Sequence, residues 1–155
     1  MPERKPLEQR FSALKGEATT WIPAWREIRN YVNPTRGRFA GDLPNRGKLI
    51  DHKLILDSHP QRAIEKLADG LAAYLTSPSR PWWRPTIDDL DLMEWGPAKE
   101  WLSKVERGMY SVQAGSNFHT AMHADYKEYA SFATSATGLF EDRRDVMRAR
   151  NYTIG

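Results

Sequence analysis

The sequence contains no cysteine among its 155 residues. Without thiolates the chain cannot form a disulfide or a cysteine-ligated zinc site. It also has no run of about 18 apolar residues, so no segment is expected to span a membrane. Residues 1–15 carry charges of both signs and no apolar stretch, which argues against a secretory signal peptide. We therefore expect a protein made in a reducing compartment, with the cytoplasm as the default.

The sequence motifs of common catalytic sites are missing as well. No Gly-x-Ser-x-Gly is present, and Gly41 and Gly47 enclose five residues where a P-loop has four. His119 and His123 have helical spacing, but Thr120 stands where a zinc protease has glutamate, and no third ligand is identifiable. The acidic turn at residues 87–91 lacks the glycine of a calcium loop. We predict no catalytic residue, no metal site and no cofactor; an enzyme, such as a metal hydrolase using the two histidines, is the last alternative.

Charge is distributed unevenly along the chain. Residues 1–62 have a net charge of +5, residues 63–142 of −5, and residues 143–155 of +3. Basic ends around an acidic middle are typical of a protein that contacts either nucleic acid or neighbouring copies of itself. The candidate residues for contact with DNA or with another subunit are Arg36, Arg38, Arg46, Lys48, Arg143, Arg144, Arg148 and Arg150.

Apolar spacing predicts several helices. A short one over residues 7–14 should stop at Gly16, and a second should start at Thr19 or Thr20, pack Trp21 and Trp25 into the core, and end before Pro34. Further helices are expected over residues 60–75, from 97 to about 115, and from 118 to 132, the last one capped by Ser116 or Asn117. The stretch between residues 33 and 48 reads as a basic surface loop.

Two segments break the helical pattern. Three prolines fix residues 76–85 as extended chain, and their tryptophan pair, Trp82 and Trp83, should pin this segment onto the preceding helix. From Leu139 onward the residues alternate with period two, which predicts a strand that stops where it should turn into a partner. We expect the core to combine the 60–75 helix, the tryptophan pair and the 98–114 helix. The four basic residues of the loop should lie outside this core.

Several of these motifs together resemble a known family. Trp21-x-Pro-x-Trp25 lies in the second helix, Leu75-Thr76-Ser77-Pro78-Ser79-Arg80-Pro81-Trp82-Trp83 follows the central helix, and Asn117-Phe118 begins the last one. This order is similar to the N-terminal region of bacteriophage portal proteins, the head-to-tail connectors of short-tailed phages. The resemblance implies a structural role for its motif residues, which are Trp21, Trp25, Leu75, Thr76, Ser77, Pro78, Arg80, Pro81, Trp82, Trp83, Asn117 and Phe118.

The resemblance also implies a function. Portal subunits form a homo-oligomeric ring of twelve at the capsid vertex of the virion, are made in the host cytoplasm, and pass double-stranded DNA during packaging and ejection. Their partners are terminase, capsid and tail or adaptor proteins. The chain would then be a non-enzymatic fragment of a longer subunit, from its wing region. The alternative is a small DNA-binding accessory protein of phage origin, whose affinity would fall steeply with salt.

Together these patterns predict a mostly α fold of the α+β class, a bundle-like helical wing with a short β segment near the C-terminus. Residues 1–50 would supply N-terminal helices and the basic loop, residues 51–138 the helical wing core, and residues 139–155 the start of a truncated β segment.

Overall fold

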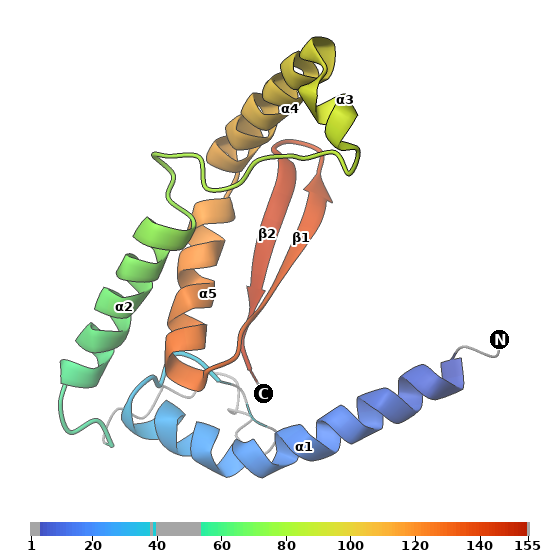
Figure 1. Cartoon of the computed structure of the whole chain (residues 1–155). Coiled ribbons are helices and arrows are strands. Elements are labelled where there is room, and N and C mark those ends of the chain that lie inside the picture. Colours follow the sequence, from blue (N-terminus) through green and yellow to red (C-terminus); the bar gives the residue numbers. More distant parts are fainter. Residues whose placement is uncertain (1–3, 38, 40–53, 155) are drawn as a thin grey trace.

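The computed structural model describes residues 4–37, 39 and 54–154. Within them the chain is mostly helical, with one short antiparallel sheet near the C-terminus, as the sequence predicts (Figure 1). The elements are α1 (Arg4–Tyr31), α2 (His59–Leu75), α3 (Leu90–Glu94), α4 (Gly96–Gly115), α5 (Phe118–Phe132), β1 (Ala136–Asp142) and β2 (Val146–Tyr152).

Helix α5 is the centre of the fold. It contacts α2 most extensively, and it also contacts both strands, α1 and α4 (Figure 1). Its buried side chains include Ala121, Tyr126 and Phe132, and the elements that it contacts bury Ala68 of α2 and Ala149 of β2. The predicted core was therefore wrong in leaving out α5. This helix is apolar on more than one side because it packs against α2 and against the hairpin.

Helix α1 is one continuous helix, so the prediction of two helices separated at Gly16 was wrong. A glycine costs a helix only about 1 kcal/mol relative to alanine, and nothing lies within 4 Å of a Cβ built at Gly16. The hydroxyls of Thr19 and Thr20 accept no capping bond there; they donate to the carbonyls of Lys15 and Glu17, one turn back. Pro23 also lies inside the helix.

The C-terminal residues form a closed hairpin instead of a lone strand. β1 and β2 pair in antiparallel register from Ala136 with Tyr152 to Asp142 with Val146. The predicted strand is thus two strands, the first of which begins at residue 136, and its partner is present. The turn between them was missed because Val146 adopts a positive φ of 65°, a conformation that no sequence rule assigns to a β-branched residue.

The acidic turn at residues 87–91 lies on the surface, as expected, and also starts a short helix. The Asp89 carboxylate accepts hydrogen bonds from the backbone N–H groups of Asp91 and Leu92, which caps α3. Asp89, one of the three clustered acidic residues, therefore serves as the N-cap of α3.

Candidate functional site

The backbone of the tryptophan segment, at residues 82–83, is hydrogen-bonded to one tyrosine hydroxyl. The Tyr110 Oη of α4 accepts hydrogen bonds from the backbone N–H groups of Trp82 (2.8 Å) and Trp83 (2.9 Å), and it donates to the Trp83 carbonyl at 2.8 Å. The Trp83 ring stacks on the Tyr110 ring with centroids 5.0 Å apart, and its Nε1 donates to Gln113. An extended proline-rich segment has no ladder partner of its own, so Tyr110 satisfies the backbone groups that the prolines leave unpaired.

Trp82 completes this attachment on the other side of the segment. Its ring lies parallel to the Phe118 ring at 6.3 Å, where α5 begins. The two tryptophans therefore pin the segment onto α4 and the start of α5, and the prediction that they would pin it onto the preceding helix was wrong. Upstream, the buried Thr76 hydroxyl accepts a hydrogen bond from Tyr126 Oη, which ties the end of α2 to α5.

Asn117 joins the two helices to the sheet. The sequence predicted a helix cap at Ser116 or Asn117, and it is the Ser116 hydroxyl that accepts from the Phe118 N–H. The Asn117 side chain makes no capping bond to α5. It pairs instead with both backbone groups of the buried Ala149: Nδ2 donates to the carbonyl and Oδ1 accepts from the N–H, each at 2.8 Å.

The inner face of α5 carries two carboxylates in an otherwise apolar row. Phe118, Ala121, Asp125, Glu128 and Phe132 recur at alternating spacings of three and four residues. This spacing was the available signal for a buried polar site, because acidic residues are rarely fully buried without a partner. We call the contacts of these two carboxylates the α5 joint.

Glu128 is the centre of the α5 joint and is fully buried (0% exposed). Its Oε1 accepts hydrogen bonds from the Thr153 hydroxyl (2.8 Å) and the Ile154 N–H (2.9 Å). Its Oε2 accepts no hydrogen bond from the part of the chain that the structure describes and lies 3.7 Å from Arg36 Nη1. The Thr153 hydroxyl also accepts from the Gly37 N–H at 2.7 Å. One carboxylate thus connects the segment after α1, helix α5 and the chain leaving β2.

Asp125 extends the α5 joint one turn earlier. Its carboxylate accepts hydrogen bonds from the hydroxyls of Ser135 (3.0 Å) and Thr137 (2.6 Å) and from Asn151 Nδ2 (3.1 Å). The two strands are therefore fastened to α5 by side chains of both. Arg36 Nη1 reaches the same place, because it donates to Asn151 Oδ1 at 2.8 Å.

The end of α1 is attached to α5 by two more hydrogen bonds. Trp25 Nε1 donates to the Phe132 carbonyl at 3.2 Å, and Asn33 Nδ2 donates to the Ser131 hydroxyl at 2.9 Å. Trp25 also stacks on Phe39 at 6.5 Å but is only half-buried, so the prediction that it packs into the core holds only in part. Trp21 is 60% exposed, so the same prediction was wrong for Trp21.

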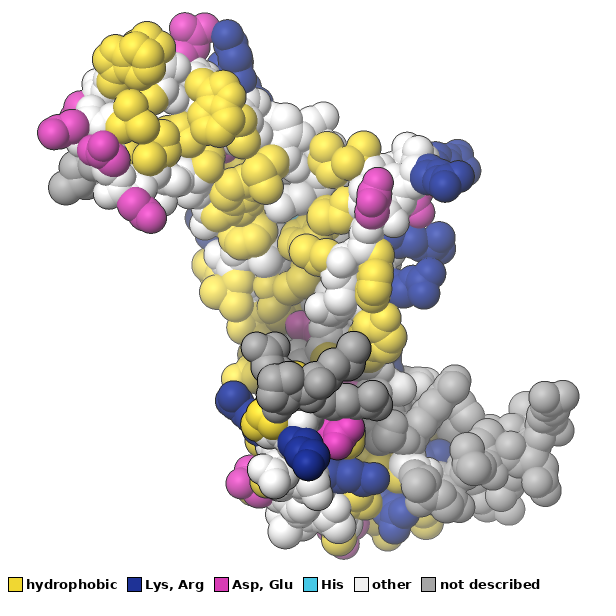
Figure 2. All heavy atoms as spheres, turned by 90° about the vertical axis from the view of Figure 1, so that its right-hand side faces the viewer, with side chains coloured by type: hydrophobic (Ala, Val, Ile, Leu, Met, Phe, Trp, Pro, Cys, Tyr) yellow, Lys and Arg dark blue, Asp and Glu magenta, His cyan; other side chains and the backbone are white. Residues whose placement is uncertain are grey.

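The candidate contact residues fall into two groups. Arg36 belongs to the α5 joint, so the expectation that it lies outside the core was wrong: it pairs with a buried carboxylate. Arg38, Arg46 and Lys48 lie outside the described residues. The remaining four are exposed on the hairpin; they are Arg143, Arg144, Arg148 and Arg150. Figure 2 shows basic side chains, in dark blue, gathered at the right-hand edge of the molecule in its upper half.

The hairpin arginines are interleaved with acidic groups. The Asp142 carboxylate accepts from the backbone N–H groups of Arg144 (2.8 Å) and Asp145 (3.2 Å), and these bonds hold the pKa of Asp142 below its ordinary value of 3.8. Arg148 lies 3.9 Å from the same carboxylate, and the Arg150 guanidinium lies 5.5 Å from the centre of the Phe140 ring. The hairpin therefore presents a mixed charge pattern.

The two spaced histidines do not meet at one site. His123 Nε2 lies 2.7 Å from Asp69 Oδ1 of α2, while His119 packs edge-on against Phe118. Among the described residues, no group of three or more His, Asp or Glu side chains could hold a metal ion. In the same part of the chain, no helix is both long and apolar enough to cross a bilayer.

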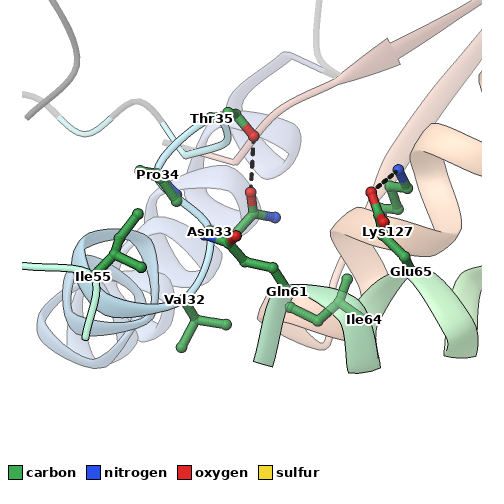
Figure 3. A pocket seen from close by; sticks show the side chains of 9 residues that line it. All are labelled: Val32, Asn33, Pro34, Thr35, Ile55, Gln61, Ile64, Glu65 and Lys127. Atoms are coloured by element: carbon green, nitrogen blue, oxygen red, sulfur yellow. Dashed lines mark hydrogen bonds and ion pairs between the residues drawn. The ribbon is translucent and has the colours of Figure 1, made fainter. Parts of the chain in front are cut away.

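A pocket of about 530 Å³ lies between the segment after α1 and the start of α2 (Figure 3). Asn33 and Thr35 line it on one side, and Ile64 and the ion pair of Glu65 with Lys127 on the other. The two charged side chains satisfy each other at 3.0 Å, so this described lining offers a ligand no unpaired charge.

Comparison with known proteins shows which family the chain belongs to. Residues 4–155 match the model of the family described as "Bacteriophage head to tail connecting protein". The chain is 38% identical over 153 residues to a protein of Bordetella phage BPP-1 named "Probable portal protein", and 32% identical over 153 residues to the "Portal protein" of Salmonella phage epsilon15.

These matches cover 99% of the chain in both cases. The chain belongs to the head-to-tail connecting protein family of bacteriophages, as its tryptophan and proline motifs indicated. It spans 27% of the length of each of these two relatives.

Proposed function

We propose that the chain is the N-terminal wing region of a phage portal subunit and that its role is structural, not enzymatic. The observation that carries the proposal is the family match, which begins at residue 4 and runs to residue 155. In this proposal, copies of the complete subunit form a ring, of twelve by analogy with the family, at the capsid vertex of the virion. Double-stranded DNA passes through that ring, and terminase, capsid and tail proteins bind to it.

The exposed apolar side chains support assembly. Large apolar side chains are exposed on α1, on α4 and on the hairpin, among them Phe11, Trp101 and Leu139, which are 68%, 60% and 56% exposed. Extended apolar surfaces of this kind are typical of sites that contact other protein. A subunit enclosed on several sides by other protein would carry such a surface.

The α5 joint and the tryptophan attachment give this region a fixed shape. The α5 joint fastens the segment after α1 and the hairpin to α5, and the tryptophan attachment fastens residues 82–83 to α4 and the start of α5. We propose that the family-motif residues act here as structural residues, with Trp82, Trp83, Asn117 and Phe118 at the contacts described above.

We further propose that the hairpin arginines contact a neighbouring protein surface in preference to DNA. Residues 141–150 contain four basic and three acidic side chains, so their net charge is only +1. A phosphate-binding surface would need a stronger positive field. The DNA-binding alternative predicts that the affinity of the chain for short duplexes falls steeply between about 50 and 200 mM salt.

Electron microscopy of the purified gene product that contains this chain tests the proposal. Closed rings are expected, and peptides from residues 4–155 should be present in purified virions. A gene product that stays monomeric and is absent from virions would refute it.

A further inference from the structure

The outer edge of β2 is closed by the side chain of Asn117. The Asn117 amide pairs with both backbone groups of Ala149, at 2.8 Å each. In an antiparallel ladder, the N–H and the C=O of one residue point to the same side of the strand. Both groups of Ala149 therefore point away from β1, and Asn117 occupies the positions that a further strand would use. No strand can pair with β2 at Ala149 while this contact holds.

The same contact shows which backbone groups of β1 point outward. Leu139 lies opposite Ala149 in the register of the hairpin, so its N–H and C=O point away from β2. The pattern repeats at every second residue, and Thr137 and Glu141 therefore present their backbone groups to the same side. Among the described residues, none donates to or accepts from the backbone of these three positions. The outer edge of β1 is thus unpaired within the described chain.

Strand β1 also lacks the usual protection of an edge strand. It contains no proline, lysine or arginine, its register with β2 has no bulge, and its two acidic residues, Glu141 and Asp142, lie at its end. Among the described elements it contacts only β2 and α5, and β2 lies between it and α5 (Figure 1). Leu139 and Phe140, on opposite faces of the strand, are 56% and 45% exposed. An open backbone edge with apolar side chains on both faces fits another strand.

A second copy of the hairpin does not fit this edge in a ring. Head-to-tail extension of the sheet would place β1 of one copy against β2 of the next, where Asn117 already pairs with Ala149. Pairing of two β1 edges would be two-fold symmetric and would end at a dimer. The chain spans 27% of the length of its two relatives, so most of a subunit of that length lies outside these 155 residues.

We propose that the sheet continues across β1 in the complete subunit, where an extended segment of the same subunit, from outside residues 1–155, pairs with the backbone of Leu139 and Glu141. Asn117 directs the added strand to this side because it closes the edge of β2. The segment that fits has apolar side chains on both faces, next to Leu139 and Phe140. A strand of the same chain is favoured because its pairing does not incur the entropy loss of bringing two molecules together. This inference rests on the proposed function and adds to it the surface on which the rest of the subunit docks.

Hydrogen exchange in the complete gene product tests the proposal, with single-residue resolution by mass spectrometry. The amides of Leu139 and Glu141 should exchange roughly 100-fold or more slowly than in an unstructured chain, both in the unassembled subunit and in the ring. The amide of Phe140, which faces β2, is the internal reference for an intact hairpin. Protection in the ring alone would assign the strand to a neighbouring copy, and exchange at unstructured rates in both forms would exclude an added strand; either result overturns the inference. Replacing residues 40–53 with a glycine–serine linker of equal length should leave the protection unchanged, and its loss would also overturn the inference.

A proline variant separates the added strand from the hairpin. Leu139→Pro removes an N–H that the pairing of β1 with β2 does not use, so the hairpin should survive while the outer edge is blocked. The Glu141 amide should then exchange at least about tenfold faster, whereas the Ala149 amide stays protected by Asn117. The matched control is Leu139→Ala, which keeps the N–H and should keep the protection of Glu141.

Unchanged exchange of Glu141 in Leu139→Pro would contradict the proposal. If the proline unfolds the hairpin, as loss of protection at Ala149 would reveal, the exchange of the unmodified gene product still decides. Free exchange of Leu139 in a gene product that forms rings refutes only the added strand. Protection of Leu139 in a gene product that forms no rings supports the added strand and refutes the proposed function.

Discussion

The buried carboxylate of Glu128 offers the sharpest test of how the fold is held. Glu128→Ala removes the acceptor of two hydrogen bonds and leaves the Thr153 hydroxyl, the Ile154 N–H and the Arg36 guanidinium without it. Each hydrogen bond to a charged group contributes about 1.5–3 kcal/mol, and breaking a buried pair costs about 3–5 kcal/mol in total.

The expected loss lies at the lower end of that range. Arg36 is 30% exposed, and its Nη1 lies 3.7 Å from a carboxylate oxygen that accepts no hydrogen bond from the described residues, so solvent screens the ionic part of the interaction. We expect Glu128→Ala to lower the free energy of unfolding by about 3 kcal/mol. For a chain of this size, that corresponds to a fall in Tm of roughly 6–12 °C.

Urea titration followed by circular dichroism measures this loss, with an unchanged m-value as the sign that only stability has changed. Glu128→Gln keeps the Oε1 acceptor and should lose less, about 1–2 kcal/mol. The control is Glu65→Ala, which breaks an exposed ion pair with Lys127 and should cost less than about 1 kcal/mol. Equal losses for Glu128→Ala and Glu65→Ala would refute the central role of the α5 joint.

Three further predictions concern the other attachments. Tyr110→Phe keeps the ring but strips three hydrogen bonds from the tryptophan segment, and thermal unfolding should show a loss of about 2 kcal/mol. Asn117→Asp sets a carboxylate oxygen against the Ala149 carbonyl, so it should destabilise the hairpin contact at least as much as Asn117→Ala, as read from the exchange of the Ala149 amide. Folding lowers the pKa of Asp142, so the stabilisation by its carboxylate is complete above pH 3.8 and is lost as the pH falls through the lowered pKa. NMR of the Arg144 amide should report this transition, and Asp142→Asn should remove it.

Much of the helical part of this fold could be predicted from sequence. The limits of α2 and α4 follow from proline at the first turn and apolar spacing, and those of α5 follow from apolar spacing; the structure agrees with all three within one or two residues. Continuity of α1 could not be predicted, because glycine and proline lower helix stability without forbidding a helix, and only the context decides. Only part of the hairpin was predicted, because a period-two pattern indicates a strand but does not show which segment pairs with it.

The α5 joint was harder to foresee because its members come from three distant segments. Arg36 and Glu128 are 92 positions apart in the sequence and Thr153 lies further still, so no local pattern links them. The only local sign was two carboxylates in the apolar row of α5. Composition had placed Arg36 in a basic loop, and its pairing with Glu128 shows why counting charges along a chain does not locate a contact surface.

The apolar residues of α1 from Leu7 to Val32 form one seam along the helix. It obeys one spacing rule along its whole length, yet its C-terminal part is half-buried within the copy and its N-terminal part is exposed. Leaving Leu7, Phe11 and Leu14 in water forgoes up to about 1.5–3 kcal/mol for each side chain. Within the described chain that free energy is not recovered by folding. We therefore expect the exposed part of the seam to add stability only where protein outside the described residues covers it.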